Sequence, residues 1–237
     1  MKPSPFRITE LKPIEIENGF LIDGFPSVGF TSAIATESLI RTTQFELAGF
    51  LDSDRFPAVS LVRNGQPHFP TSIYVNNQLN VAVFSSYLTL NESLHKVMAR
   101  TILQWAKKHS VSYVVSSVAV KSPDEGKITA AGSTDAARNL IKEKGIQVLE
   151  HGAIPGIPGA LLNQGMINNQ NVIVVLFNSN QTGPDFKSSA DLCTVMAKLV
   201  PGVSCDIPAL QKEAEKVEEV MKEAKEEAKN LSDGMYR

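Results

Sequence analysis

The sequence YVVSSVAV, residues 113–120, contains no charged side chain and is rich in β-branched valine. Such a run is typical of a strand that is buried on both faces of a sheet. The sequence VIVVLF, residues 172–177, repeats this pattern. Between the two runs, residues 133–144 have a helical pattern that ends at Gly145, where glycine can adopt the left-handed cap conformation. Strands that alternate with helices predict an α/β domain.

The same alternation continues outward from these two runs. Further strands are predicted at residues 19–23, 58–62, 73–75 and 79–84, with a hairpin turn at Asn76-Asn77, and further helices at residues 27–40 and 185–199. Asn91 is a predicted N-cap, and the helix that follows places Leu94, Met98, Ile102 and Trp105 on one face. We therefore expect a three-layer α/β/α fold with a mostly parallel or mixed sheet, plus a long C-terminal helix.

The overall composition is that of a globular protein, with 43% hydrophobic and 20% charged residues. Lys and Arg total 23 and Asp and Glu total 25, a net charge of −2, which argues against a nucleic-acid partner. No apolar run approaches the roughly 20 residues that cross a bilayer. The first thirteen residues contain no hydrophobic segment of a secretory signal. We expect a cytoplasmic protein with no membrane partner.

Cysteine and histidine usage predicts neither a disulfide framework nor a metal site. Cys193 lies in an apolar helical pattern and is interpreted as a small buried hydrophobe. Cys205 lies in a loop-like segment, where no neighbour would activate its thiol. The four histidines share no short spacing with Asp, Glu or Cys; they are His68, His95, His109 and His151. No cofactor and no metal is expected.

Three further motifs have the appearance of enzyme elements. GFPSVGFT, residues 24–31, has the GxxxxG spacing of a phosphate loop, but Phe30 stands where that loop needs a lysine, so we interpret it as a structural turn. HGAIPGIPG, residues 151–159, could line a ligand pocket, although a tight crossing into a helix near Gly159 fits equally small residues. Ser85-Ser86 and Ser116-Ser117 lie near strand ends but lack the GxSxG elbow, so no catalytic residue is predicted.

The composition changes near Pro208. Residues 209–237 contain six basic and eight acidic residues, whereas residues 1–208 contain 17 of each. Apolar residues follow a heptad seam in this segment: Leu210, Ala214, Val217, Met221, Ala224, Ala228 and Leu231. The seam predicts an amphipathic helix that packs either against its own domain or against a second copy, and both interpretations remain open.

The sequence closes with Met235-Tyr236-Arg237, preceded by the flexible residues Ser232-Asp233-Gly234. A terminal carboxylate can be captured by a lysine or by backbone amides of a partner. Met235 would supply an adaptable apolar contact, and Tyr236 a rigid ring with an orienting hydroxyl. We therefore expect Met235, Tyr236 and Arg237 to bind a partner protein.

The order of several motifs is similar to that of a known family. These motifs are GFPSVG (24–29), the run 79–86 before Asn91, PGIPGALL (155–162), Pro184-Asp185, Ala190 and residues 206–210. Their order resembles the proteasome assembly chaperone family of the type-two kind. The resemblance implies a nucleoside-phosphorylase-type fold without its catalytic residues, and homo-oligomers. It also implies that the tail Met235-Tyr236-Arg237 docks between α-subunits of the 20S core particle.

The leading hypothesis is therefore an ATP-independent proteasome assembly chaperone or docking factor that is not an enzyme. Residues 1–208 would form the α/β body, residues 209–230 the amphipathic helix and residues 231–237 the docking tail. Its partners would be 20S α-subunits, further copies of the chain and a related chaperone subunit. The alternative is a small-molecule-binding protein or enzyme, with its site near Gly24, Ser86 and Gly156. A third hypothesis is a scaffold whose heptad seam pairs with an unrelated helix.

Overall fold

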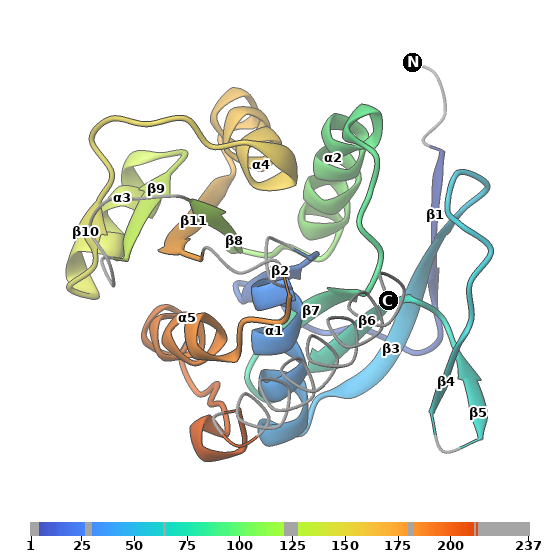
Figure 1. Cartoon of the computed structure of the whole chain (residues 1–237). Helices are drawn as coiled ribbons and strands as arrows, with labels where there is room; N and C mark the ends of the chain where they lie inside the picture. The colour runs from blue at the N-terminus through green and yellow to red at the C-terminus, as the bar shows by residue number, and fades with distance from the viewer. Residues whose placement is uncertain are drawn as a thin grey trace, which may run out of the picture.

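A computed structural model describes residues 5–26, 30–63, 65–120, 128–179, 183–210 and 212. Within these residues the chain forms eleven strands and five α-helices (Figure 1). In chain order they are β1 (Phe6–Glu10), β2 (Phe20–Gly24), α1 (Thr31–Thr42), β3 (Glu46–Ser53), β4 (Leu61–Arg63), β5 (Gln66–His68), β6 (Thr71–Asn76), β7 (Val81–Ser86), α2 (Glu92–Lys108), β8 (Tyr113–Val120), β9 (Thr129–Gly132), α3 (Asp135–Glu143), β10 (Gln147–Val148), α4 (Gly156–Asn168), β11 (Asn171–Asn178) and α5 (Phe186–Leu199).

The main sheet is mixed, as the sequence predicts. Among the described residues it has nine strands in the order β1-β3-β6-β7-β2-β8-β11-β9-β10. The four central strands β7, β2, β8 and β11 are mutually parallel, whereas β1, β3 and β6 pair antiparallel at one side. The central strands are buried along most of their length because helices cover both of their faces. Their carboxyl ends therefore meet at one edge of the sheet.

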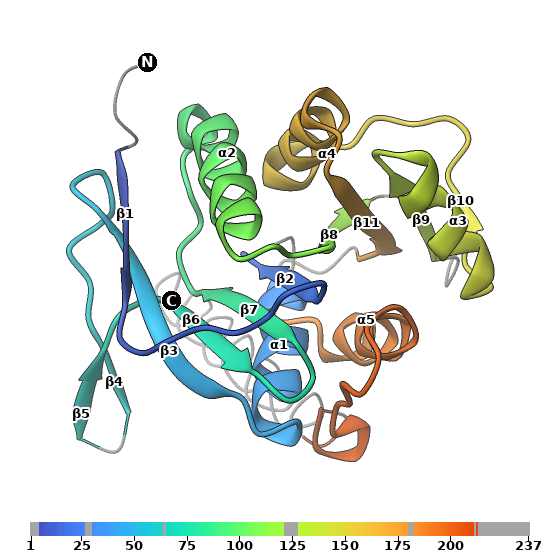
Figure 2. The same cartoon turned by 180° about the vertical axis from the view of Figure 1, so that it is seen from behind.

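Helices cover both faces of the sheet and complete the predicted three layers. Helices α2 and α4 lie on one face, and α1 and α5 lie on the other (Figures 1 and 2). Each face has its own core cluster: α2 and α4 contribute to one, and α1, α3 and α5 to the other. In the described part of the chain, no helix is both long and apolar enough to span a membrane.

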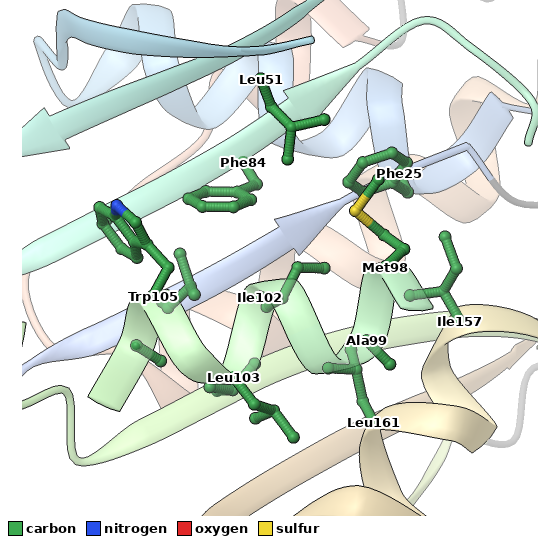
Figure 3. Close-up of a cluster of buried hydrophobic side chains, with 14 of the residues drawn as sticks. Phe25, Leu51, Phe84, Met98, Ala99, Ile102, Leu103, Trp105, Ile157 and Leu161 are labelled. Carbon is green, nitrogen blue, oxygen red and sulfur yellow. The ribbon is translucent and has the colours of Figure 1, made fainter. Parts of the chain in front are cut away.

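Helix α2 confirms the predicted pattern of its sequence. Met98 and Ile102 are fully buried, and Trp105 meets Phe84 of β7 with ring centroids 4.9 Å apart (Figure 3). The N-cap prediction is also correct, since the Asn91 side chain accepts a hydrogen bond of 3.0 Å from the Ser93 N–H. The cap and the apolar face together explain why this segment is helical.

The predicted strand at residues 58–62 is wrong in extent and in role. Only residues 61–63 are extended there, and they pair with β5 in a separate hairpin that lies outside the main sheet (Figure 1). Val62 is 70% exposed, so its side chain contributes nothing to the core. β-branched composition signals an extended segment but cannot show which sheet the segment joins.

Other element boundaries differ from the predicted ones, and some strands were not predicted. Helix α1 begins at Thr31 rather than at residue 27, and residues 27–29 lie outside the described part. Asn76 is the last residue of β6 and pairs with Val81, so the hairpin turn is residues 77–80. The edge strand β1 and the bulged β3 were not predicted. The alternation of buried and exposed residues in β1 is itself the signal of a half-buried strand, whereas the register shift between Leu47 and Gly49 interrupts that alternation in β3. Gly145 does adopt the left-handed conformation, with φ of 68°.

Candidate functional site

The residues predicted to bind a partner, Met235, Tyr236 and Arg237, lie outside the described part of the chain. The heptad seam beyond Leu210 also lies outside the described residues, so the boundaries of the arm and of the tail, at residues 230 and 231, stay predictions. The structure does describe residues 200–210, which we call the arm base, because the predicted C-terminal helix (the arm, residues 209–230) starts there.

A disulfide bond joins the arm base to the body. Cys193 of α5 is bonded to Cys205 of the arm base, with their Cα atoms 6.1 Å apart. The prediction that Cys193 is buried is confirmed, but reading the two cysteines as separate thiols was wrong. Helix α5 packs against α1, with the Cys193 Sγ 3.5 Å from the carbonyl oxygen of Ala35, and the arm base brings the Cys205 Sγ to 4.0 Å from the same oxygen. Tertiary packing therefore creates the cross-link.

Hydrogen bonds also hold the arm base against α1. The Asp206 N–H donates to Ser38 Oγ at 3.2 Å, and the Ser204 N–H donates to Thr43 Oγ1 at 3.1 Å. The Asp206 carboxylate then accepts from the Ala209 N–H at 3.0 Å, as an N-cap does. Residues 207–210 are helical. The first turn of the arm is thus capped and fixed in position on the body.

A groove lies beside this first turn, between α1 and α5, and we call it the α1 groove. Its volume is about 640 Å³. Apolar side chains dominate its lining: Phe30, Ala33, Ile34, Pro184, Phe186, Ala209 and Leu210. Its polar residues include Glu37, whose carboxylate accepts a hydrogen bond from the Tyr87 hydroxyl. Leu210 is buried and Phe30 is 43% exposed, so apolar surface remains open in this groove.

A buried polar cluster lies at the carboxyl end of β2, beside the middle of β8. Asp23 is 3% exposed, and its Oδ2 accepts a hydrogen bond of 2.6 Å from Ser116 Oγ. Its Oδ1 accepts from the Phe25 N–H at 3.2 Å. Burial raises the pKa of the Asp23 carboxyl to about 6, although these two hydrogen bonds oppose the rise. The hydroxyls of Ser32 and Ser117 bond each other at 2.7 Å. Asp23 is therefore an acid that titrates near neutral pH.

Asp23 also borders a second cavity, of about 810 Å³, at the carboxyl edge of the parallel strands. Apolar residues from three segments wall it, including Phe25, Leu88, Leu90, Ile154 and Ile157. The first five residues of α2 add Glu92, His95 and Lys96. A mostly apolar cavity with a few polar groups is the ordinary form of a small-ligand site.

Gly24 and Ser86 of the predicted motifs make structural contacts, whereas Gly156 lines a cavity. A Cβ on Gly24 would lie 2.6 Å from Thr36 Oγ1 and 2.9 Å from the Phe84 carbonyl oxygen, so this residue lets α1 approach β7 closely. Ser86 is buried and accepts from the Leu88 N–H at 3.1 Å. Gly156 lines the 810 Å³ cavity with the rest of its loop, and its helix begins at Gly156 itself rather than near Gly159.

Asp23 is the site residue that sequence reasoning missed. The available signal was a carboxylate at the end of a buried strand, residues 20–24, where a charge is costly unless it is bonded. Sequence reasoning also missed the partner of His109. Its Nε2 lies 2.9 Å from Glu10 Oε1, and the same oxygen accepts a hydrogen bond from Trp105 Nε1. Within the described ranges, no group of three or more His, Cys, Asp or Glu could hold a metal ion.

Known proteins share this fold over nearly the whole chain. The crystal structure of Pyrococcus furiosus PbaA, an archaeal homolog of proteasome-assembly chaperone, matches with a TM-score of 0.79 and 27% identity, over 93% of this chain and 97% of PbaA. Pyrococcus furiosus PbaB, an archaeal proteasome activator, matches with a TM-score of 0.75 and 20% identity, over 94% of this chain and 100% of PbaB, which shows the fold alone. An uncharacterized protein of Methanocaldococcus jannaschii is 23% identical over 221 residues, 93% of this chain and 91% of that protein. The model of the PAC2 family matches residues 21–225, so the family resemblance is confirmed and this chain belongs to the PAC2 family.

Proposed function

We propose that this protein is an ATP-independent assembly chaperone or docking factor for the proteasome core particle. The observation that carries the proposal is membership of the PAC2 family together with the 27% identity to an archaeal homolog of proteasome-assembly chaperone. Residues Met235, Tyr236 and Arg237 would make the contact with the α-ring of the 20S particle. No step of this docking needs a nucleotide or a metal ion.

The chemistry of the tripeptide suits a pocket between two subunits. Met235 fills an apolar depression, and the Tyr236 ring packs beside it while its hydroxyl reaches a polar group at the rim. The carboxylate that follows Arg237 accepts hydrogen bonds from a lysine or from backbone amides. One such tail binds weakly. Several tails on a homo-oligomer, or on a complex with a related chaperone subunit, bind more strongly because the first contact raises the effective concentration of the others.

The anchored arm base supports this role. The Cys193–Cys205 disulfide and the hydrogen bond from the Asp206 N–H to Ser38 hold the start of the arm on the body. A fixed starting point restricts the volume that each tail explores, which reduces the entropy lost on binding. Residues 1–208 then serve as the platform from which the tails are presented.

Deleting residues 235–237 is expected to abolish co-elution of the protein with 20S core particles or isolated α-subunits. Tyr236→Ala should weaken binding at least about tenfold, since a buried aromatic anchor contributes on the order of 2 kcal/mol. Lys229→Ala is the matched control, because Lys229 lies six residues before Met235. The melting temperature of every variant should stay near that of the parent, because the tail adds little to the fold. Unchanged co-elution of the truncated protein would refute the tail mechanism.

The 810 Å³ cavity beside Asp23 favours a second candidate function, the binding of a small molecule. Thermal-shift measurements with nucleosides, nucleotides and inorganic phosphate test it. Ala160→Phe places a ring in the cavity and should remove a saturable shift, whereas Met166→Phe on the exposed end of the same helix should not. No shift across the three compound classes would count against this second function.

A further inference from the structure

The cavity of about 810 Å³ is lined by a buried carboxylate that has no cationic partner. Within the described part of the chain, no lysine, arginine or histidine forms an ion pair with Asp23. Its two hydrogen bonds, from Ser116 Oγ and from the Phe25 N–H, use two of the roughly four lone-pair positions of a carboxylate. A buried charge is costly unless an opposite charge or further donors compensate it. Asp23 can therefore still accept hydrogen bonds, and the cavity is the route by which a ligand reaches it.

The register of β2 shows which face of the sheet Asp23 occupies. Side chains alternate between the two faces of a strand. Leu21 belongs to the core cluster of α2 and α4, and Ile22 belongs to the cluster on the opposite face. Asp23 consequently shares the face of Leu21, where α2 and α4 lie. Its carboxylate sits at the inner, sheet end of the cavity between these two helices.

The walls of the cavity match an apolar molecule. Phe25, Leu88 and Leu90 are buried side chains that line it, and Ile154 and Ile157 line it from the segment that leads into α4. A volume of about 810 Å³ lies within the range of small-molecule sites, roughly 300–1,000 Å³. The ligand therefore has an apolar body as well as a group that meets Asp23.

The other charged side chains of the described lining come from α2 and lie toward solvent. Glu92 and Lys96 are exposed and of opposite sign, and the half-buried His95 donates from Nε2 to the Leu90 carbonyl oxygen at 3.1 Å. The described lining residues from β8 and α4 carry no charge. The charged residues of α1, Glu37 and Arg41, line the α1 groove instead. Asp23 is thus the charge that decides what binds at the inner end.

We propose that this cavity binds an organic amine, a molecule with an apolar, ring-sized body and a primary ammonium group that pairs with Asp23. An ammonium has three donors on a compact head and supplies the missing opposite charge. A neutral molecule leaves the carboxylate without that charge, and an anion is repelled by it. The proposal rests on the second candidate function, small-molecule binding in this cavity, and is independent of proteasome docking.

Pairing with Asp23 makes the binding depend on pH. The ammonium of the ligand stays charged up to about pH 10, as a lysine does. Burial raises the pKa of Asp23 to about 6, so about one carboxyl in eleven is ionised at pH 5 and nearly all are ionised at pH 7.5. Because the ammonium pairs with the ionised form, the dissociation constant should be about tenfold smaller at pH 7.5 than at pH 5. His95 can also gain a proton in this pH range, so a variant must separate the two groups.

Isothermal titration calorimetry of the full chain tests the proposal with three probes: tryptamine, tryptophol and indole-3-acetate. The three share one ring system and differ in the head group, which is an ammonium, a hydroxyl and a carboxylate. At pH 7.5 tryptamine should bind at least about tenfold more tightly than tryptophol, and indole-3-acetate more weakly than both. Only tryptamine should show the tenfold change between pH 5 and pH 7.5.

Substitutions assign the effect to Asp23. Asp23→Asn keeps the shape and removes the charge, so it should weaken tryptamine binding at pH 7.5 at least about tenfold and abolish its pH dependence. Tryptophol binding should stay unchanged in this variant, which shows that the cavity is intact. Asp191→Asn is the matched control, because Asp191 is an exposed carboxylate of α5 on the other face of the sheet, and it should change nothing. His95→Gln should keep the tenfold pH dependence.

Each contrary outcome has a definite meaning. Tryptamine binding that survives Asp23→Asn, or that tightens toward pH 5, would overturn the proposal. Binding of a nucleoside, a nucleotide or phosphate that Ala160→Phe removes, without binding of tryptamine, would overturn it and leave the second candidate function standing. Absence of binding by every compound would overturn both. Deletion of residues 235–237 should leave tryptamine binding unchanged, which separates this site from the docking tail.

Discussion

In the parent protein, we expect ionisation of the buried Asp23 to lower the free energy of unfolding as the pH rises. Replacing Asp23 by asparagine should abolish this pH-dependent loss of stability. In the folded protein burial raises the pKa of Asp23 from its ordinary value of 3.8 to about 6. The fold therefore favours the protonated acid. The stability that this acid contributes is fully present below about pH 4 and is lost as pH rises through about 6, because the buried carboxyl must then carry a charge.

The size of the effect follows from the two pKa values. A rise from 3.8 to about 6 corresponds to about 3 kcal/mol of differential free energy. Between about pH 4 and about pH 8, roughly 2.4 kcal/mol of this difference develops, because the unfolded chain is already half ionised at the lower limit. Asparagine fits the same position: its carbonyl oxygen can accept from the Phe25 N–H, and its amide can donate to Ser116 Oγ.

Urea unfolding of both proteins across this pH range measures the effect. The free energy of unfolding of Asp23→Asn minus that of the parent should increase by about 2 kcal/mol from pH 4 to pH 8. Taking the difference cancels the titration of all other groups. Ser116→Ala removes a donor to the ionised form and should move the transition to higher pH. A difference that stays flat with pH would refute the argument that Asp23 is desolvated.

Two further predictions concern stability. Cys193→Ser with Cys205→Ser should lower the free energy of unfolding by about 3 kcal/mol, because the disulfide closes a short loop of sequence separation 12. Thermal melts with and without reductant measure this loss of stability. A melting temperature that does not change with reductant would contradict the bond. Asn91→Ala should cost about 1 kcal/mol through loss of the bond to the Ser93 N–H, whereas Asn91→Asp should restore it; equal denaturation midpoints for the two variants would argue against the cap.

The two candidate functional regions lie on different parts of the fold. The arm base and the α1 groove belong to the face covered by α1 and α5, whereas the cavity beside Asp23 opens at the carboxyl edge, between α2 and α4. Tyr87 and Leu88 are neighbours in sequence, yet Tyr87 lines the groove and Leu88 lines the cavity. The loop after β7 is thus shared by both, and a ligand in the cavity would contact the segment that also borders the groove.

Much of the body could be predicted because its signals are local. The runs at residues 113–120 and 172–177 are short, apolar and rich in β-branched residues, which is typical of buried strands, and both are confirmed as β8 and β11. The Asn91 cap and the four-residue spacing after it define α2 from neighbours a few positions apart. The prediction of a strand at residues 58–62 was wrong because its signal is not local. Whether that segment joins the main sheet or a separate hairpin depends on the path of the whole chain.

The sequence by itself determined the alternation of strands and helices, the start of α2, the family resemblance and the choice of Met235-Tyr236-Arg237 as the candidate contact. Tertiary structure alone decided that Cys193 meets Cys205, that Ser116 bonds Asp23 from 93 residues away, and that Leu210 reaches the α1 groove. A local sequence pattern reflects how favourably a residue interacts with its near neighbours in the chain. A bond between distant residues depends instead on how the completed layers pack, and no short window of the sequence contains that information.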